Sequence, residues 1–367
     1  MIKVFGVINH NNLGGAQKAM SKLKASYEFD AEVSFDIVYL YQAKGSEHTA
    51  LNGVILTKNA TVLKYVIAPF KLFRYLKKSN PDVIVSFLPL SNITAPICGW
   101  LAGIGKRIIS HRNPVSSYNK LLKSLDRYTG NSFFVSKIIC NSNSVKTSVF
   151  KYPKAYQSKV TIINNCVEPF SESSPSELIV NLEREYSEFT NIVTVGRLAV
   201  QKNYEFALEV LKELPQAALH IAGHGDLFDS LDKLARDLGV RKRVNFLGSV
   251  GHLDIQHLLK FCDIYLQTST FEGQSNSLLE AICAKCVIVS SDIPPQREVL
   301  VSNDGALQAG VLISLDVSAK QWAKEINKLL DDEVERESLR KAAGLRSLDF
   351  SIESYSNEFK KVFFEND

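Results

Sequence analysis

The chain lacks a disulfide framework and any long apolar run. Its six cysteines show no pairing pattern, and Cys283 and Cys286 form a C-x-x-C with no second Cys or His pair nearby. Buried free thiols are therefore expected, rather than a zinc or redox site. The longest apolar stretch, residues 93–105, is interrupted by Pro96 and three glycines, whereas a membrane span needs about 20 residues. These absences predict a protein of a reducing, cytoplasmic compartment with no spanning helix.

The pattern along the chain is a regular alternation of short Val/Ile/Phe-rich runs with segments of helical periodicity, which is typical of βαβ units on parallel sheets. Residues 1–8 read as a first strand, since they are too short and wrongly flanked for a signal peptide. Predicted strands are 3–8, 36–41, 83–87, 107–110, 137–140, 160–163, 192–195, 218–222, 244–247, 263–267, 287–291 and 311–313. Predicted helices include 14–26, 62–78, 120–134 and 204–214.

The length predicts two domains. A chain of 367 residues with 45% hydrophobic content exceeds what one core usually serves. The polar stretch 169–176 is the best linker, which gives an N-terminal domain of 1–168 and a C-terminal domain of 177–350. Residues 351–367 then hold a last helix, near 352–364. Both domains are expected to be α/β and Rossmann-like.

A motif with two carboxylates follows the predicted strand 263–267 and opens a helix. Glu272 lies in its turn, and Glu280, eight residues later, lies about one turn into the helix. A helix N-terminus offers unpaired N–H groups and a positive dipole end to an anion, here over the residues Gly273, Gln274, Ser275, Asn276, Ser277 and Leu278. The two glutamates would accept hydrogen bonds from sugar hydroxyls on either side. An ordinary strand-turn-helix with a capping Ser or Asn and two solvated glutamates is the alternative.

A second cluster follows the predicted strand 192–195. Gly196 and Arg197 come directly after it, and Lys202 follows shortly before the helix 204–214. Strand ends of this kind are where open α/β sheets bind ligands. Arg197 is suited to fork two N–H bonds onto a diphosphate, and Lys202 supplies a point charge. A solvated surface pair is the alternative for each residue taken alone.

These motifs, in this order, resemble the retaining GT-B glycosyltransferases of family four. The resemblance rests on 195–198, Lys202 with Asn203, 221–225, 244–248 and the Glu272 to Glu280 pair, and on the N-terminal sequence Gly14-Gly15-Ala16-Gln17. Further similar segments are 81–88, Asn141-Ser142 and 162–165. The resemblance covers nearly the whole chain. It implies a GT-B fold, in which two Rossmann-like domains face a central cleft and the last helix returns to the first domain.

The resemblance also implies a reaction. A sugar would move with retention from a nucleotide diphospho-sugar, most often a UDP-hexose or UDP-N-acetylhexosamine, to a glycan acceptor, lipid-linked in bacterial surface polysaccharide synthesis. Arg197, Lys202 and the helix end at 274–278 would stabilise the leaving phosphate without metal or cofactor, and the chain contains no D-x-D. Glu280 would contact the ribose, Glu272 the transferred sugar, and Gly14 and Gly15 the diphosphate. A GT-B epimerase or phosphorylase, or a non-catalytic nucleotide-sugar binder, stays open as an alternative.

His111 follows the predicted strand 107–110 at the level where many members of that family present an acceptor-domain histidine. A contact to the sugar or acceptor, aiding proton transfer, is one interpretation. A structural turn closed by Asn113-Pro114 is the other. The chain also departs from the family pattern after Glu280, where Lys285 and Val287 stand in place of Gly and Pro. This departure raises doubt about the helix-to-strand connection.

Charge is divided unevenly along the chain. Residues 1–168 carry 22 Lys and Arg against 8 Asp and Glu, a net charge of +14, and the remainder carries 21 against 31, a net charge of −10. The basic segments 70–78 and 120–127 contain aromatic and apolar residues and suit an anionic partner. An anionic membrane surface, reached from the cytoplasmic side, is the sharper hypothesis, and a solvated helix face is the plain one. No nucleic-acid-binding motif is present, so nucleic acid is not an expected partner.

Overall fold

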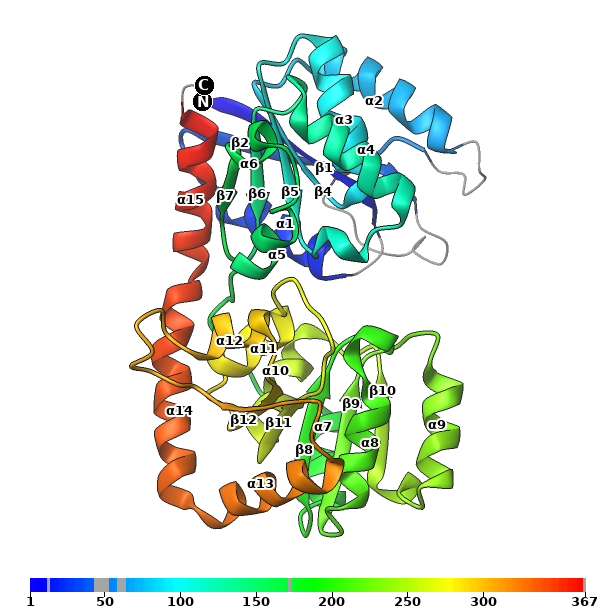
Figure 1. Cartoon of the computed structure of the whole chain (residues 1–367), viewed down its shortest axis with the longest axis vertical. Coiled ribbons are helices and arrows are strands. Elements are labelled where there is room, and N and C mark those ends of the chain that lie inside the picture. Colours follow the sequence, from blue (N-terminus) through cyan, green and yellow to red (C-terminus); the bar gives the residue numbers. More distant parts are fainter. Residues whose placement is uncertain (12–13, 43–52, 58–63, 171–172, 366–367) are drawn as a thin grey trace. The chain divides into compact units, whose positions relative to one another are not determined.

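The computed structural model describes residues 1–11, 14–42, 53–57, 64–170 and 173–365, with the side chains of 64–66 left aside. The chain forms two compact units (Figure 1). Unit 1 contains Met1–Cys166 and Ile352–Asp367, and unit 2 contains Val167–Ser351. The C-terminal segment therefore belongs to the same unit as the N-terminus.

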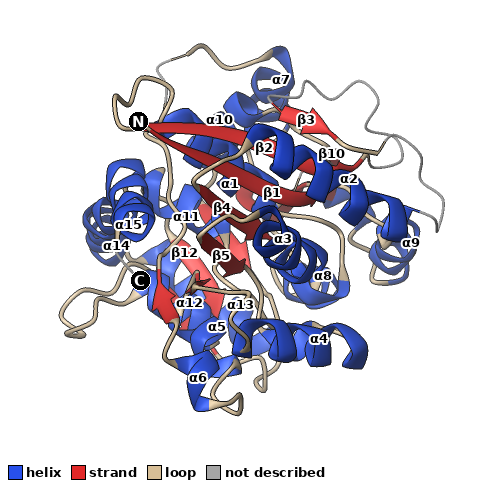
Figure 2. Cartoon of the chain, turned by 90° about the horizontal axis from the view of Figure 1, so that it is seen from above, coloured by secondary structure: helices blue, strands red, loops and turns tan. Residues whose placement is uncertain are grey.

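Unit 1 is built on a parallel sheet of seven strands in the order β3-β2-β1-β4-β5-β6-β7. Figure 2 shows β2, β1, β4 and β5 in that order. The strands are β1 (Ile2–His10), β2 (Val33–Tyr41), β3 (Gly53–Ile55), β4 (Val83–Phe87), β5 (Lys106–His111), β6 (Lys137–Cys140) and β7 (Val160–Ile162).

Helices cover both faces of this sheet. On one face, α1 and α15 bury residues such as Met20 and Phe359 against the strands. On the other face, α2 and α3 pack against β1 and β4, and the segment around Tyr156 packs against β5 and β6. The helices are α1 (Gly15–Ser26), α2 (Lys64–Ser79), α3 (Pro89–Ala102), η1 (Val115–Ser117), α4 (Lys120–Asn131), α5 (Asn143–Ser148), α6 (Lys154–Gln157) and α15 (Ile352–Phe364).

Unit 2 repeats the same architecture. Its six parallel strands lie in the order β10-β9-β8-β11-β12-β13. They are β8 (Thr190–Val195), β9 (Ala217–Ala222), β10 (Val244–Gly248), β11 (Ile264–Gln267), β12 (Ile288–Ser291) and β13 (Val311–Ile313). The chain runs outward from β8 through β9 to β10, and then returns to place β11 on the other side of β8. Such a reversal is a topological switch point, where open α/β sheets bind ligands.

The sheet of unit 2 also has helices on both faces. α8, α9 and α13 share one core, in which Trp322 is fully buried. α7, α10, α11 and α12 share the other core with part of α14. The helices are α7 (Glu177–Glu185), η2 (Val200–Lys202), α8 (Tyr204–Lys212), α9 (Phe228–Asp237), η3 (Arg241–Arg243), α10 (His252–Phe261), α11 (Asn276–Cys283), α12 (Pro294–Leu300), α13 (Ala319–Asp331), α14 (Glu333–Ser347) and η4 (Leu348–Phe350).

The structure confirms the α/β class with two parallel sheets. The strand β3 was not predicted, and the apolar stretch 93–105 lies largely in α3, which continues through Pro96. Part of the predicted linker, residues 171–172, lies outside the described residues, as do the first two residues of the predicted helix 62–78. None of the described helices is long and apolar enough to cross a membrane.

Lys285, one of the two departures from the family pattern, lies in the connection that follows α11. Its φ is +59°, in the left-handed region that glycine favours, and a helix often ends with such a residue just after its last turn. The connection therefore keeps the glycine conformation without the glycine. The substitution is accommodated at a backbone cost of roughly 1–2 kcal/mol.

Candidate donor site in unit 2

The site lies where β8 and β11 end side by side. These two strands are hydrogen-bonded neighbours at the switch point of the sheet. The segment 196–203 follows β8, and the segment 268–275 follows β11. Because parallel strands end at the same edge, the two predicted clusters meet there.

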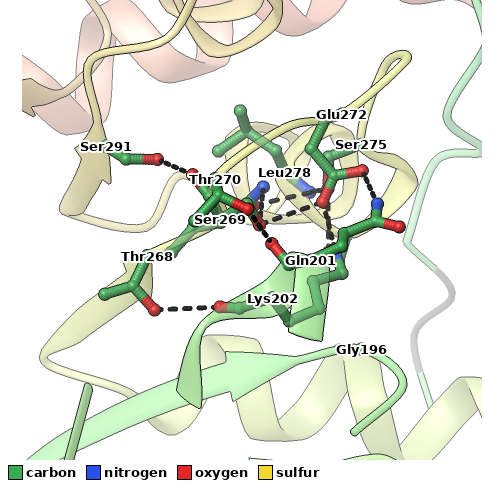
Figure 3. Close-up of polar contacts among 12 residues, drawn as sticks. Gly196, Gln201, Lys202, Thr268, Ser269, Thr270, Glu272, Ser275, Leu278 and Ser291 are labelled. Carbon is green, nitrogen blue, oxygen red and sulfur yellow. Dashed lines mark hydrogen bonds and ion pairs between the residues drawn. The ribbon is translucent and has the colours of Figure 1, made fainter. Parts of the chain in front are cut away.

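Hydrogen bonds join the two segments directly (Figure 3). Thr268 Oγ1 donates to the backbone carbonyl of Lys202 at 3.0 Å and approaches that of Asn203 at 2.9 Å. The backbone N–H of Thr270 donates to the carbonyl of Gln201 at 2.9 Å. Asn203 has a φ of +53°, which turns the chain from η2 into α8. The 3-10 turn that carries Gln201 and Lys202 is thus fixed against the loop that carries Glu272.

Gly196 and Gly223 allow two strand ends to approach closely. A Cβ on Gly223 would lie 1.8 Å from the carbonyl oxygen of Gly196, so no other residue fits without moving the backbone. The hydroxyl of Tyr204 donates to that same carbonyl at 2.9 Å. Burial raises the pKa of Tyr204 well above its usual value, so the phenol stays protonated as a donor. The backbones at the ends of β8 and β9 therefore pack directly against each other.

The carboxylate of Glu272 is the centre of the polar network in Figure 3. Lys202 Nζ lies 2.7 Å from Oε1, and Ser269 Oγ donates to the same oxygen at 3.0 Å. Gln201 Nε2 donates to Oε2 at 2.8 Å. The Glu272 residue is only 6% exposed, which excludes the solvated glutamate of the plain interpretation. The carboxylate is thus held by one cation and two neutral hydrogen-bond donors.

The α11 N-terminus is capped from within the same network. Ser275 Oγ accepts from the backbone N–H of Leu278 at 3.4 Å and donates to Gln267 Oε1 at 3.3 Å. Gln267 Nε2 in turn approaches Ser269 Oγ at 3.4 Å, and Ser277 Oγ lies 3.1 Å from Ser275 Oγ. The cap and the Glu272 carboxylate are thereby connected through Ser269. This geometry presents the positive end of a helix beside a fixed negative charge.

The remaining predicted residues of this loop are mostly buried. Gly273, Gln274 and Ser277 are buried, and Asn276 is half-buried. Glu280, in the first turns of α11, is 3% exposed, so the second predicted glutamate is not a solvated one either. All the residues predicted for the α11 segment thus lie in one compact structure.

Arg197 differs from Lys202 in its surroundings. Its side chain is exposed, and no hydrogen bond or ion pair joins it to any residue that the structure describes. Lys202, by contrast, is committed to Glu272. Sequence reasoning assigned both residues to a diphosphate and did not foresee this pairing. It also missed Gln201 and Ser269, although both are polar residues at strand ends.

Gly14 and Gly15 lie in unit 1, at the start of α1. Gly14 is the N-cap of this helix, in extended conformation and with no side-chain cap. The first N–H groups of α1 follow β1, which adjoins β4 at the switch point of the first sheet. The placement suits the anion contact that the sequence predicts.

His111 lies at the end of β5 and is fully buried. Its Nδ1 is 3.0 Å from the Tyr118 hydroxyl and its Nε2 is 2.8 Å from the Tyr156 hydroxyl. The Tyr156 hydroxyl also donates to Asp126 Oδ2 at 3.0 Å, and Asp126 Oδ1 lies 3.4 Å from His111 Nε2. Burial raises the pKa of Asp126, against the lowering effect of His111 and of the Tyr156 hydrogen bond. Both ring nitrogens are therefore engaged inside unit 1. This geometry favours a positioning role, and a contact of His111 with substrate stays a prediction.

Within the described ranges, no group of three or more His, Cys, Asp and Glu side chains is arranged to hold a metal ion. All six cysteines are free thiols, and Cys262 and Cys283 are only half-buried. The site chemistry visible in unit 2 consists of a helix N-terminus, a free guanidinium and the Lys202–Glu272 pair.

Comparisons with known proteins show what the chain is similar to. Residues 178–346 match the family model described as Glycosyl transferases group 1. The chain is 27% identical over 345 residues to the capsular polysaccharide biosynthesis glycosyltransferase CapH of Staphylococcus aureus, covering 90% of this chain and 91% of that protein. It is also 27% identical over 382 residues to an alpha-1,4-N-acetyl-D-galactosaminyltransferase of Campylobacter jejuni that acts on a GalNAc-GalNAc-diNAcBac-PP-undecaprenol, covering 100% and 99%.

Among solved structures, Anabaena Alr3699/HepE in complex with UDP-glucose superposes with a TM-score of 0.83 at 18% identity, covering 98% of this chain and 99% of that one. At this identity the likeness shows the fold, which is GT-B.

Proposed function

Because this chain belongs to the glycosyl transferases group 1 family and has a GT-B fold, we propose that it is a retaining, metal-independent hexosyltransferase. Its donor is a UDP-hexose or UDP-N-acetylhexosamine. Its acceptor is a lipid-linked glycan in the synthesis of a bacterial surface polysaccharide, such as an O-antigen or a capsule. The relatives support this proposal, since one belongs to capsule synthesis and one acts on an undecaprenol-linked glycan.

The observation that carries the proposal is the meeting of two kinds of group at one switch point. The N-terminus of α11 and the exposed Arg197 offer positive charge, while the buried Glu272 offers a fixed acceptor. A nucleotide diphospho-sugar needs both, because its diphosphate is anionic and its sugar carries hydroxyl donors. Neither group alone distinguishes a sugar nucleotide from a simple anion.

Each residue then has a role in the proposed reaction. Arg197 and the α11 N-terminus bind the diphosphate and stabilise the charge that develops on it as the glycosidic bond breaks. Glu272 contacts the transferred sugar, and Glu280 contacts the ribose. Lys202 stays paired with Glu272 and adds its positive charge beside the diphosphate.

Unit 1 supplies the acceptor side in this proposal. Unit 1 also contributes to the donor side, where Gly14 and Gly15 at the start of α1 let the backbone approach the diphosphate closely. His111 stays a candidate for acceptor contact, held by Tyr118 and Tyr156. The leaving phosphate itself is the proposed base for the acceptor hydroxyl, so the reaction does not need a protein base.

Unit 1 also carries a surface suited to an anionic membrane, which we call the basic face: the exposed residues of α2, α3 and α4. α3 contacts both α2 and α4, and Figure 1 shows the three helices together. Exposed cations alternate there with exposed apolar side chains: Phe70, Lys71, Arg74, Lys77, Lys78, Trp100, Leu101, Lys120, Leu121, Lys123, Leu125, Arg127 and Tyr128. Cations near anionic lipid gain about 1 kcal/mol each, and aromatic rings favour the interface. We propose that this face docks the enzyme peripherally at the inner face of the cytoplasmic membrane.

Two other functions fit parts of the site. A GT-B epimerase or phosphorylase would also bind a nucleotide or sugar phosphate, and a non-catalytic nucleotide-sugar binder would use the same contacts without turnover. A transferase releases UDP only when an acceptor is present, and this dependence separates it from an epimerase or a phosphorylase. The intact Arg197, Lys202, Glu272 and Glu280 favour an active enzyme over a binder.

A thermal-protection screen of nucleotide sugars tests the proposal. A ligand at 100 times its dissociation constant stabilises the folded protein by about 2.7 kcal/mol. The account predicts that one or more UDP-sugars raise the unfolding temperature more than UDP does. Protection by no nucleotide or nucleotide sugar would reject the donor site.

A further inference from the structure

The contacts of the Glu272 carboxylate fix its orientation. Its Oε1 receives Lys202 Nζ and Ser269 Oγ, and its Oε2 receives only Gln201 Nε2. A carboxylate has about four lone-pair sites. The one site that is left therefore belongs to Oε2, the oxygen that Gln201 touches.

Gln201 is itself fixed by the loop that it serves. Its backbone carbonyl accepts the N–H of Thr270 at 2.9 Å, and its side chain reaches back to Glu272 (Figure 3). The side chain is half-buried, and its Oε1 has no hydrogen-bond partner among the described residues. Figure 3 shows this oxygen pointing away from Glu272. Gln201 thus lies at the edge of the Glu272 network, with its Nε2 inside the network and its Oε1 outside it.

Lys202 and Ser269 cannot do what Gln201 does. Both bind Oε1, and the terminal torsion of a glutamate is broad. A carboxylate that is bound through one oxygen only can still rotate about this torsion. Its rotation would change the direction of the free Oε2 lone pair. The bond from Gln201 removes this freedom, because it holds the second oxygen.

We propose that Gln201 is a positioning residue of the donor site, which acts through Glu272 and aims one Oε2 lone pair at a hydroxyl of the donor sugar. The inference rests on the proposed function. It makes Gln201 important for the sugar part of the donor and unimportant for UDP, whose phosphates and base do not reach Glu272 in this proposal.

Two variants separate positioning from folding. Gln201→Met keeps the length of the side chain and removes the donor. Gln201→Glu keeps the shape of the side chain and places a second carboxylate beside that of Glu272. Two carboxylates that share a site do not both stay ionised without a large free-energy penalty. Gln216→Met, at an exposed glutamine of the same unit, is the matched control.

The experiment compares UDP affinity by calorimetry with steady-state kinetics for the UDP-sugar that protects the wild type. For Gln201→Met we expect unchanged UDP affinity and a loss of about 10- to 100-fold in kcat/KM for the UDP-sugar, the loss typical of a hydrogen bond to a charged group. For Gln201→Glu we expect activity relative to wild type to rise as the pH falls, because a proton shared by the two carboxyls restores the hydrogen bond. Gln216→Met should match the wild type in both measurements.

Equal losses of UDP affinity and of UDP-sugar turnover in Gln201→Met would overturn the inference, as would a Gln201→Glu pH profile parallel to that of the wild type. These outcomes leave the proposed function standing, since they are read against an active wild type. A wild type that binds UDP and transfers no sugar would overturn the proposed function and the inference together.

Discussion

Glu272 Oε1 and Lys202 Nζ lie 2.7 Å apart, although one residue follows β11 and the other follows β8. The side chain of Glu272 is 7% exposed and that of Lys202 is 15% exposed, so the pair has little contact with solvent. Removing one partner of such a pair leaves an uncompensated buried charge, which costs about 3–5 kcal/mol, whereas removing both often costs little. The ion pair therefore also holds the segment that follows β8 against the segment that follows β11.

Lys202→Met should lower the free energy of unfolding of unit 2 by about 3 kcal/mol, and the double variant Lys202→Met with Glu272→Gln should recover most of this loss. The reason is that the amide introduced at position 272 is uncharged and does not need a cation as its partner. Urea unfolding in a Trp100→Phe background measures it, because Trp322, fully buried in unit 2, is then the single tryptophan. A double variant as unstable as Lys202→Met would contradict a dominant ion pair.

Arg197→Ala should leave the stability of unit 2 unchanged, since the side chain is exposed and has no partner among the described residues. It should weaken UDP binding and lower kcat by about 100-fold or more, the typical loss for a group that stabilises transition-state charge. Glu280→Ala is expected to raise the KM for the donor through its lost ribose contact. Calorimetry with UDP and steady-state kinetics test both variants. Wild-type kinetics in both would remove these residues from the donor site.

The stability of unit 2 should fall as the pH falls from about 6.5 to about 4. Burial lowers the pKa of His220 from 6.5 to about 4, and its neutral ring suits its partners, because Nε2 lies 2.9 Å from Asn191 Oδ1 and Nδ1 lies 3.2 Å from Asn245 Nδ2. In this pH window the unfolded chain binds a proton that the folded chain does not, so unfolding becomes more favourable as pH falls, by up to about 3 kcal/mol.

Urea midpoints of unit 2 measured in the Trp100→Phe background at several pH values check this expectation. His220→Gln should flatten the pH dependence in the same window, because no group at position 220 then titrates. A slope of unchanged size in His220→Gln would show that another group is responsible.

Replacing Lys71, Arg74, Lys77 and Lys78 together by Gln should reduce binding to anionic vesicles and activity on a lipid-linked acceptor. The four side chains are exposed on α2, and surface charges act over about 8 Å at physiological salt, so wild-type binding should also fall with ionic strength. Hydrolysis of a water-soluble donor should not change. Co-sedimentation with vesicles across a salt series measures the effect.

A matched variant in unit 2, with Gln at the exposed Lys233, Lys242, Lys320 and Lys324, removes the same charge from the other unit. It should bind vesicles as the wild type does. Equal losses in the two variants would point to net charge rather than to the basic face, and no binding at low salt would reject the membrane role.

The positions of most strands along the chain could be predicted from the sequence because each buried strand carries its own apolar run. The strand β3 could not, since Gly53, Val54 and Ile55 form too short a run to stand out. The apolar stretch 93–105 gave no helix prediction because Pro96 interrupts it, yet Ala95, Cys98 and Ala102 bury one side of α3 against the sheet.

The sequence predicts the two clusters of the site, but it does not predict the contacts between them. Sequence position does not show that Lys202 faces Glu272 rather than solvent, because the pairing depends on β8 and β11 becoming neighbours. The same limit applies to His111. Its partner Tyr156 comes from α6, which only the packing of the sheet brings to the end of β5. Lys285 shows the opposite case, in which a residue that departs from the family pattern adopts the left-handed conformation that glycine favours.

We propose transfer with retention from a UDP-sugar, and the anomeric configuration of the product distinguishes retention from inversion. The protein is incubated with the UDP-sugar that protects it best and with a polyprenyl-diphosphate-linked glycan, and the new linkage is examined by NMR. The account predicts an alpha linkage from an alpha-linked donor, with one UDP released for each sugar transferred. A beta linkage, or UDP release without any glycan product, would contradict it.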